Sequence, residues 1–147
     1  MKLLIAAIGK AKAGPELQLY HDYVKRLSWK VTLKELDVRP ASKEKEADKL
    51  LSACEGYARL IALDETGKQF SSPQFAQQLG AWQQAGHSSL AFVIGGADGL
   101  HESVRARAHL VWALGSLTWP HMLVRALLAE QLYRAQSILS GHPYHRV

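Results

Sequence analysis

Short, almost wholly apolar runs that alternate with helical periods are the feature that most constrains the fold of this 147-residue chain. The run LLIAAI follows Lys2, and LAFVI, the most strongly apolar segment, occupies residues 90–94. A strand that is covered on both faces of a sheet needs no apolar–polar alternation, because both sets of its side chains are buried. Helices between such strands provide the crossovers that parallel strands require. The sequence therefore predicts an α/β fold, with a mostly parallel sheet flanked by helices.

The expected elements follow one another with short connections. We expect strands at residues 2–8, 31–38, 59–63, 90–94 and 110–114, of which the imperfectly alternating segment 31–38 suits a sheet edge. We expect helices at residues 15–28, 43–57, 101–108 and 122–140, and another that begins at Ser72 and Pro73 and ends near Gly86. Residues 64–67, with the sequence DETG, are expected to form an acidic turn. No repeat or long linker divides the chain, so we expect one domain over residues 1–147.

The composition excludes several classes of protein. Apolar residues make up 48% of the chain, enough for a core without disulfides or metals, and the lone Cys54 is expected to be a small buried residue. The first apolar run is too short for a signal peptide and leads directly to Lys10 and Lys12, and no segment approaches the roughly twenty apolar residues of a membrane helix. We expect a cytoplasmic protein that binds no membrane and no metal.

The distribution of charge favours a polyanionic partner. The formal net charge is +5, and after Glu102 the chain has five arginines, four histidines, no lysine and a single acid, Glu130. Arginine's planar fork suits phosphates and nucleobases better than general solubility requires. The pattern favours an RNA-facing surface over a merely solvated one.

Two segments are candidates for a ligand site. Residues 95–99, GGADG, follow the most apolar strand, where open α/β sheets often bind ligands, although the spacing is neither a dinucleotide fingerprint nor a phosphate loop. Residues 114–121, LGSLTWPH, offer few polar side chains, so a ligand there would be held by backbone groups and apolar walls, as suits an adenine and a sulfonium. On local sequence alone, the first could be an ordinary turn and the second a simple connection in which Pro120 sets the helix entry.

The long helix carries apolar residues on more than one face: Leu123, Val124, Leu127, Leu128, Leu132 and Leu139. The surplus indicates either a dimer interface or core packing. Arg125 lies in this apolar background and must find an acid, a group of carbonyls or a substrate phosphate, because a buried unpaired charge is costly.

The segment GHPYHRV at residues 141–147 concentrates an aromatic ring, two imidazoles and a guanidinium. Such groups stack on bases and contact phosphates. The alternatives are a tail docked on its own core and a weak metal-binding tract, and the second is disfavoured because His142 and His145 lack a clear third ligand.

Taken together, these segments resemble the ribosomal large-subunit RNA methyltransferase H family, the pseudouridine N3-methylating branch of the SPOUT superfamily. The resemblance covers nearly the whole chain and rests on IAAIGKAK at 5–12, YVKRL at 23–27, LDETGK at 63–68, FVIGGADGL at 92–100, LTWPHMLVRALLAEQLYRA at 117–135 and HPYHR at 142–146. The combination of IGGADG, PHMLVR and HPYHR is very specific.

The resemblance implies a SPOUT-type domain with a C-terminal trefoil knot, S-adenosyl-L-methionine as cofactor, a homodimer, and 23S rRNA in the assembled 70S ribosome as substrate. The implied cofactor-binding residues are Leu63, Gly95, Gly96, Gly115, Ser116, Leu117, Thr118, Trp119 and Pro120. The implied substrate contacts are Arg125, Arg134 and Tyr144, with Lys10, Lys12 and Arg26. The candidate catalytic residues are His145, His121 and Arg146. A non-catalytic ribosome- or RNA-binding factor that retains the fold is the alternative function, and a nucleotide-binding regulator is disfavoured because no phosphate loop is present.

Overall fold

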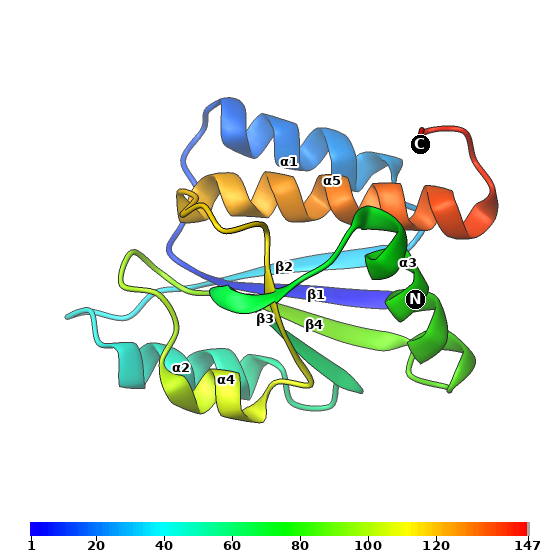
Figure 1. The fold of residues 1–147 in the computed structure, drawn as a ribbon. Coiled ribbons are helices and arrows are strands. Elements are labelled where there is room, and N and C mark those ends of the chain that lie inside the picture. The colour runs from blue at the N-terminus through cyan, green and yellow to red at the C-terminus, as the bar shows by residue number, and fades with distance from the viewer. Residues whose placement is uncertain (147) are drawn as a thin grey trace.

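The computed structural model describes residues 1–146 and shows a five-stranded parallel sheet with helices on both faces (Figure 1). The strands are β1 (Lys2–Ile8), β2 (Lys30–Leu36), β3 (Arg59–Gln69), β4 (Ser89–Ile94) and β5 (Leu110–Ala113), in the order β2-β1-β4-β3-β5. The helices are α1 (Pro15–Arg26), α2 (Lys43–Ala53), α3 (Ser72–Gln84), α4 (Glu102–Arg107) and α5 (His121–Ser140). The predicted α/β class is confirmed, whereas the trefoil knot stays a prediction.

The apolar runs form the middle of the sheet. β1 pairs with β2 and β4, and every residue of β1 after Lys2 is buried. Alternate β1 residues serve two cores: Leu3 and Ile5 point to one face, and Leu4 and Ala6 to the other. β2 lies at the edge and alternates in exposure, as predicted. Burial on both faces explains why the central strands read as continuous apolar runs.

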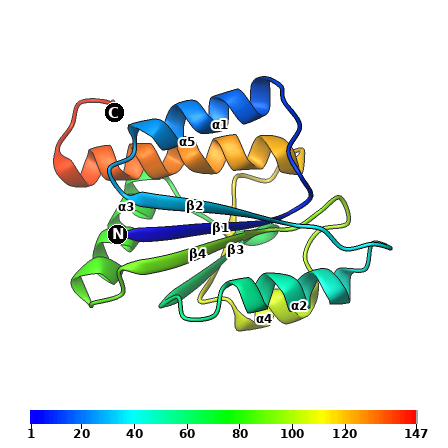
Figure 2. The same cartoon turned by 180° about the vertical axis from the view of Figure 1, so that it is seen from behind.

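The helices form two layers. α1, α3 and α5 cover one face of the sheet, and α2 and α4 cover the other, as the reverse view also shows (Figure 2). α5 packs against both α1 and α3, so it is covered on three sides. Leu128 and Leu132 are fully buried, whereas Leu139 near the end of the helix is 42% exposed. Packing between two helices and a sheet therefore accounts for most of the apolar width of α5.

The segment after Leu63 differs from the prediction. Residues 64–67 do not end the strand, because β3 continues to Gln69, and both Leu63 and Lys68 are paired with Trp112. Two β3 residues opposite one β5 partner define a bulge, which turns the intervening residues out of the ladder. A Cβ on Gly67 would lie 2.6 Å from the backbone of Val111, so only glycine fits at this crossing.

The ends of several helices also differ. Ser71, not Ser72, is the N-cap of α3. Its hydroxyl accepts a hydrogen bond from the backbone N–H of Gln74, and the Gln74 side-chain oxygen accepts one from the backbone N–H of Ser71. α1 and α2 end earlier than predicted, at Arg26 and Ala53. These shifts leave the topology unchanged.

Cys54 is 8% exposed, and burial raises the pKa of its thiol to about 11, in agreement with the expected inert cysteine. Within residues 1–146 no helix combines the length and apolarity needed to cross a membrane. Among these residues, no group of three His, Cys, Asp or Glu side chains is placed to hold a metal ion.

Candidate functional site

A cavity of about 780 Å³ opens at the carboxyl ends of β3, β4 and β5. Its walls come from three stretches of chain: residues 63–66, the glycine loop, defined here as residues 95–99, and the α5-entry loop, defined as residues 114–120. Further lining side chains come from neighbouring elements: Lys43, Arg105, Trp112, His121 and Val124. The carboxyl edge of a parallel sheet is where open α/β folds bind ligands.

The glycine loop turns too tightly for side chains. A Cβ on Gly95 would lie 2.8 Å from backbone atoms of Gly99. The Gly99 N–H donates to the Gly96 carbonyl at 3.0 Å, and Gly99 has a φ of +79°, a left-handed conformation that favours glycine. At Gly95, Gly96 and Gly99 this wall therefore presents backbone to a ligand, and Ala97 and Asp98 add side chains.

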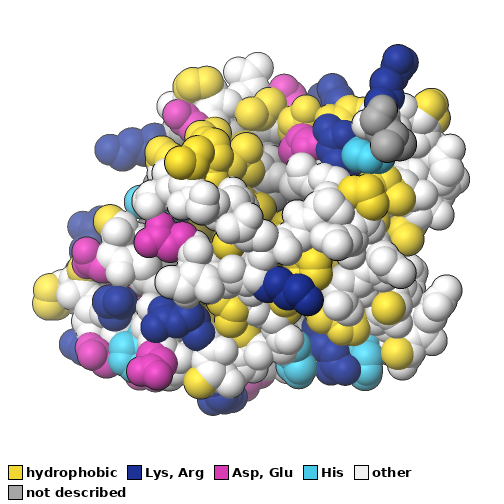
Figure 3. Space-filling model, viewed as in Figure 1, with side chains coloured by type: hydrophobic (Ala, Val, Ile, Leu, Met, Phe, Trp, Pro, Cys, Tyr) yellow, Lys and Arg dark blue, Asp and Glu magenta, His cyan; other side chains and the backbone are white. Residues whose placement is uncertain are grey.

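The α5-entry loop forms an apolar wall that side chains fasten in place. The Trp119 indole N–H donates to the Leu114 carbonyl at 2.9 Å, and the Thr118 hydroxyl donates to the Glu65 carboxylate at 2.5 Å. Leu117 and Trp119 remain 65% and 37% exposed. Figure 3 shows apolar side chains gathered above the start of α5. Such a wall suits a flat, weakly polar ring.

The lining of the cavity includes an ion pair and a stacked tryptophan. Arg105 and Asp64 form an ion pair at 3.4 Å, and Arg105 also donates to the Leu100 carbonyl at 2.7 Å. The Trp112 ring stacks on Phe75 with centroids 4.1 Å apart, and its buried indole N–H has no hydrogen-bond partner among residues 1–146. An unsatisfied buried donor is costly unless a ligand or water accepts from it. Glycine backbone and an apolar wall together fit an adenosine-like ligand.

The cavity gathers most of the predicted cofactor residues: Leu63, Gly95, Gly96, Leu117, Thr118, Trp119 and Pro120. Gly115 and Ser116 belong to the α5-entry loop but do not line the cavity. His121, the first residue of α5, lines it as well. Sequence reasoning missed Trp112 and Arg105, because an apolar strand and a short amphipathic helix give no signal that a side chain faces a ligand.

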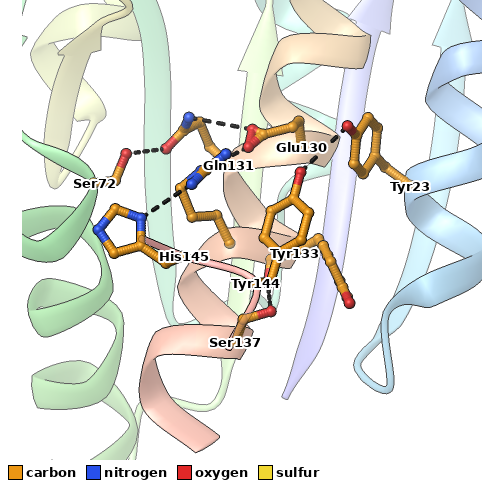
Figure 4. Close-up of polar contacts among 9 residues, drawn as sticks. Tyr23, Ser72, Glu130, Gln131, Tyr133, Ser137, Tyr144 and His145 are labelled. Atoms are coloured by element: carbon orange, nitrogen blue, oxygen red, sulfur yellow. Dashed lines mark hydrogen bonds and ion pairs between the residues drawn. The ribbon is translucent and has the colours of Figure 1, made fainter. Parts of the chain in front are cut away.

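The C-terminal residues pack toward the other end of α5, where Figure 4 shows Tyr23, Tyr133, Tyr144 and His145. We call these four residues, together with Arg26 and Arg134, the tail cluster. The Tyr144 hydroxyl donates to that of Tyr23 at 3.3 Å, and its ring meets Tyr133 edge-on at 4.7 Å. Burial and the bond to Tyr23 raise the pKa of Tyr144 to about 12. Within one chain, the tail is docked on its own core, one of the two principal alternatives left open by the sequence.

Arginines complete the tail cluster. The Arg134 guanidinium donates to Glu130 at 2.7 Å, lies 3.0 Å from Nδ1 of His145 and covers the Tyr144 ring at 4.8 Å. Arg26 lies over the rings of Tyr23 and Tyr133, at 5.1 and 5.8 Å from their centroids. The structure thus brings together Arg26, Arg134, Tyr144 and His145 among the predicted residues, while Arg146 is exposed beside them.

The pocket and the tail cluster are far apart in one chain. α5 has 20 residues, so at 1.5 Å per residue its ends are about 30 Å apart. His121 lies at the first residue, and the tail begins after the last. The candidate catalytic residues therefore separate, with His121 at the pocket and His145 and Arg146 at the other end.

Arg125, which the resemblance implies as a substrate contact, is buried among groups of its own chain. It is 2% exposed, and its guanidinium donates to Glu35 at 2.5 Å and to the carbonyls of Ile8 and Gly9 at 3.3 and 2.8 Å. The acid and the carbonyls that an arginine in this apolar helix needs are thus supplied by β1 and β2 of its own chain. Burial disfavours the charged form of Glu35, but hydrogen bonds from the Ala11 N–H and Arg125 outweigh it and hold the pKa of Glu35 below its usual value.

Known proteins match this chain over nearly its whole length. A family model described as a predicted SPOUT methyltransferase matches residues 1–145. The proteins named Ribosomal RNA large subunit methyltransferase H of Rhodospirillum centenum and Paramagnetospirillum magneticum are each 53% identical, with 99% of both chains covered. That of Dinoroseobacter shibae is 48% identical over the full length of both chains. A probable methylase family protein from Haemophilus influenzae has the same fold, with a TM-score of 0.59 at 11% identity, over 99% of this chain and 70% of that one.

Proposed function

Because this chain belongs to the SPOUT methyltransferases, in the family of ribosomal RNA large subunit methyltransferase H, we propose that it methylates N3 of a pseudouridine in 23S rRNA. S-adenosyl-L-methionine is the donor and supplies a methyl group activated by a sulfonium. The substrate is the assembled 70S ribosome in the cytoplasm. The observation that carries the proposal is the cavity in which the glycine loop and the α5-entry loop meet.

The residues of the cavity have separable roles. The glycine loop binds the donor through backbone groups, and the α5-entry loop provides the apolar wall and excludes water. Trp112, stacked on Phe75, closes the inner side of the cavity. Rigid backbone at the glycine loop would hold the donor in a fixed orientation, and such positioning contributes to the rate.

His121 is the titratable imidazole at this cavity. An imide nitrogen must lose its proton before it accepts a methyl group, and imidazole titrates near neutral pH. We assign the proton transfer to His121 in the chain that binds the donor. Backbone N–H groups at the start of α5, which Pro120 leaves without a side-chain cap, can stabilise the developing negative charge.

The separation of the two sites supports a homodimer. The tail folds back so that His145 contacts Arg134, which is 13 residues along α5 from His121, or about 20 Å at 1.5 Å per residue, whereas a second copy can place its tail at the pocket. Exposed Leu117 and Trp119 at the pocket mouth provide apolar surface for that contact. We propose a homodimer in which each tail cluster faces the partner's pocket and contributes arginine and aromatic contacts to the RNA.

The test combines calorimetry and nucleoside analysis. The protein is titrated with S-adenosyl-L-methionine, and then incubated with labelled donor and 70S ribosomes, separated subunits or naked 23S rRNA before nucleoside mass spectrometry. Micromolar binding and labelled N3-methylpseudouridine from 70S ribosomes are expected. Ribosomes that lack the pseudouridine should stay unlabelled. Absence of donor binding and of label would instead favour a non-catalytic RNA-binding factor.

A further inference from the structure

A second cavity of about 270 Å³ lies between the β1–α1 loop and the first turns of α1 and α5. Lys10 and Lys12 stand at its rim and are exposed, and Tyr20 and Arg125 are buried within it. It has about a third of the volume of the donor pocket, 270 against 780 Å³, so it suits a small group rather than a nucleoside. Neither donor binding nor methyl transfer, as described above, uses it.

The charges that line the second cavity favour an anion. Lys10, Lys12 and Arg125 contribute three positive charges, and Glu16 is the one carboxylate among the described lining residues. Glu35 pairs with Arg125 from the strand side, which leaves an excess of positive charge at the rim. Low-dielectric walls strengthen the attraction of such a cavity for an anion.

Two sets of donors near the second cavity have no partner among residues 1–146, and both add positive potential there. Arg125 is 2% exposed and lines the cavity, yet its Nε–H has no hydrogen-bond partner among residues 1–146. α1, a helix of 12 residues, begins at the cavity with Gly14 as its N-cap and without a side-chain cap. The free N–H groups of a first helical turn attract anions, and phosphate above all.

The position of the cavity relates it to the donor pocket. His121 lines the donor pocket, and the next residue, Met122, lines the second cavity. A Cβ on Gly9, between them, would lie 3.3 Å from Met122 and 4.0 Å from His121. The two cavities therefore lie on either side of Gly9 and the first residues of α5.

We propose that the second cavity binds a phosphate of the RNA strand next to the target nucleotide. The proposal rests on the proposed function, since it needs an RNA substrate whose target base enters the donor pocket. Lys10 and Lys12 pair with the phosphate oxygens at the rim, while the first turn of α1 and the buried Arg125 provide positive potential below it. This contact fixes the register of the strand and carries no sequence information.

The experiment compares the double variant Lys10→Ala/Lys12→Ala with the matched control Lys34→Ala/Lys45→Ala. All four lysines are exposed, and each variant loses two positive charges. Calorimetry gives the affinity for S-adenosyl-L-methionine, methyl transfer to 70S ribosomes gives KM and kcat, and sedimentation with ribosomes gives the dependence of binding on salt.

We expect the cavity variant to bind the donor as the wild type does, with KM for ribosomes raised on the order of tenfold and kcat little changed. The slope of log affinity against log salt should fall by about 0.7 to 0.9 for each phosphate that the variant no longer neutralises, and the control should keep the wild-type slope. A KM and slope equal to those of the control would overturn the proposal, as would weakened donor binding. If the wild type transfers no methyl group, the proposed function fails, while the sedimentation arm still tests the cavity.

Discussion

A mixed dimer tests whether each tail completes the pocket of the partner. One subunit carries Gly95→Val, whose side chain would collide with backbone atoms that lie 2.8 Å from a Cβ at this position. The other subunit ends at Gly141 and so lacks the tail. Each variant is expected to be inactive as a homodimer, because every site has either a blocked pocket or a missing tail.

The structure gives the magnitude of the effect. In the structure the tail folds back so that His145 contacts Arg134, which is 13 residues along α5 from His121, or about 20 Å at 1.5 Å per residue. In this arrangement the tail does not reach the pocket of its own chain. In the mixed dimer, one of the two sites combines an intact pocket with an intact tail, so we expect about half of the wild-type activity.

The assay uses two different affinity tags, tandem purification of the mixed dimer, and methyl incorporation into 70S ribosomes. The reciprocal dimer provides the control: both changes are placed in one subunit and paired with a wild-type subunit. If each tail acts at the partner's pocket, this second dimer is inactive. One of its pockets is blocked, and the other faces a subunit that lacks the tail. An inactive first dimer and a half-active second dimer would refute the reasoning and place the tail in its own subunit.

Three further predictions concern single positions. Gly95→Ala should weaken donor binding by at least about tenfold in calorimetry, whereas Gly80→Ala, whose Cβ meets only the end of a flexible side chain at 3.0 Å, should bind normally. Glu35→Ala leaves Arg125 buried without its acid and should lower the free energy of unfolding in urea by about 3 kcal/mol. Because the pKa of Glu35 is held below its ordinary 4.5, the stability difference between the wild type and Glu35→Gln should be constant above about pH 4.5 and shrink as pH falls further; a pH-independent difference would contradict this pairing. Cys54, with its pKa raised to about 11, should resist iodoacetamide at pH 8 until the protein unfolds, and rapid labelling of the native protein would contradict its burial.

The sequence predicted strands correctly where the burial of a segment is visible in the pattern of its own apolar residues. The apolar runs of β1 and β4 predicted central strands, and the alternation in residues 31–38 predicted an edge, because burial on two faces or one leaves a direct pattern in the residues. The extension of β3 could not be predicted in the same way. Residues 64–67 have the composition of a turn, and only the pairing of Leu63 and Lys68 with the same tryptophan keeps them in a bulged strand.

Arg125 shows the corresponding limit for the site. Its sequence context required a partner but did not say which, since an acid, a carbonyl group and a phosphate can each accept hydrogen bonds from a guanidinium. The partner, Glu35, is 90 residues away on an edge strand, where a charged side chain is ordinarily solvated and gives no sign of a buried partner. The positions of the two pocket loops were easier to predict, because glycine and proline indicate backbone conformations that helices and strands do not adopt.

The network around Arg125 also gives a reason for retaining a buried charge. A buried ion pair contributes little net stability compared with apolar residues of the same volume, so stability alone does not explain it. Glu35 accepts hydrogen bonds from both Arg125 and the Ala11 N–H, and Arg125 holds the carbonyls of Ile8 and Gly9. These bonds fix the β1–α1 loop against the first turns of α5, where His121 lines one cavity and Met122 the other. Directional bonds can set that relation, whereas apolar packing would allow the loop to slide, and a methyl transfer that depends on the position of one nucleotide requires a fixed loop.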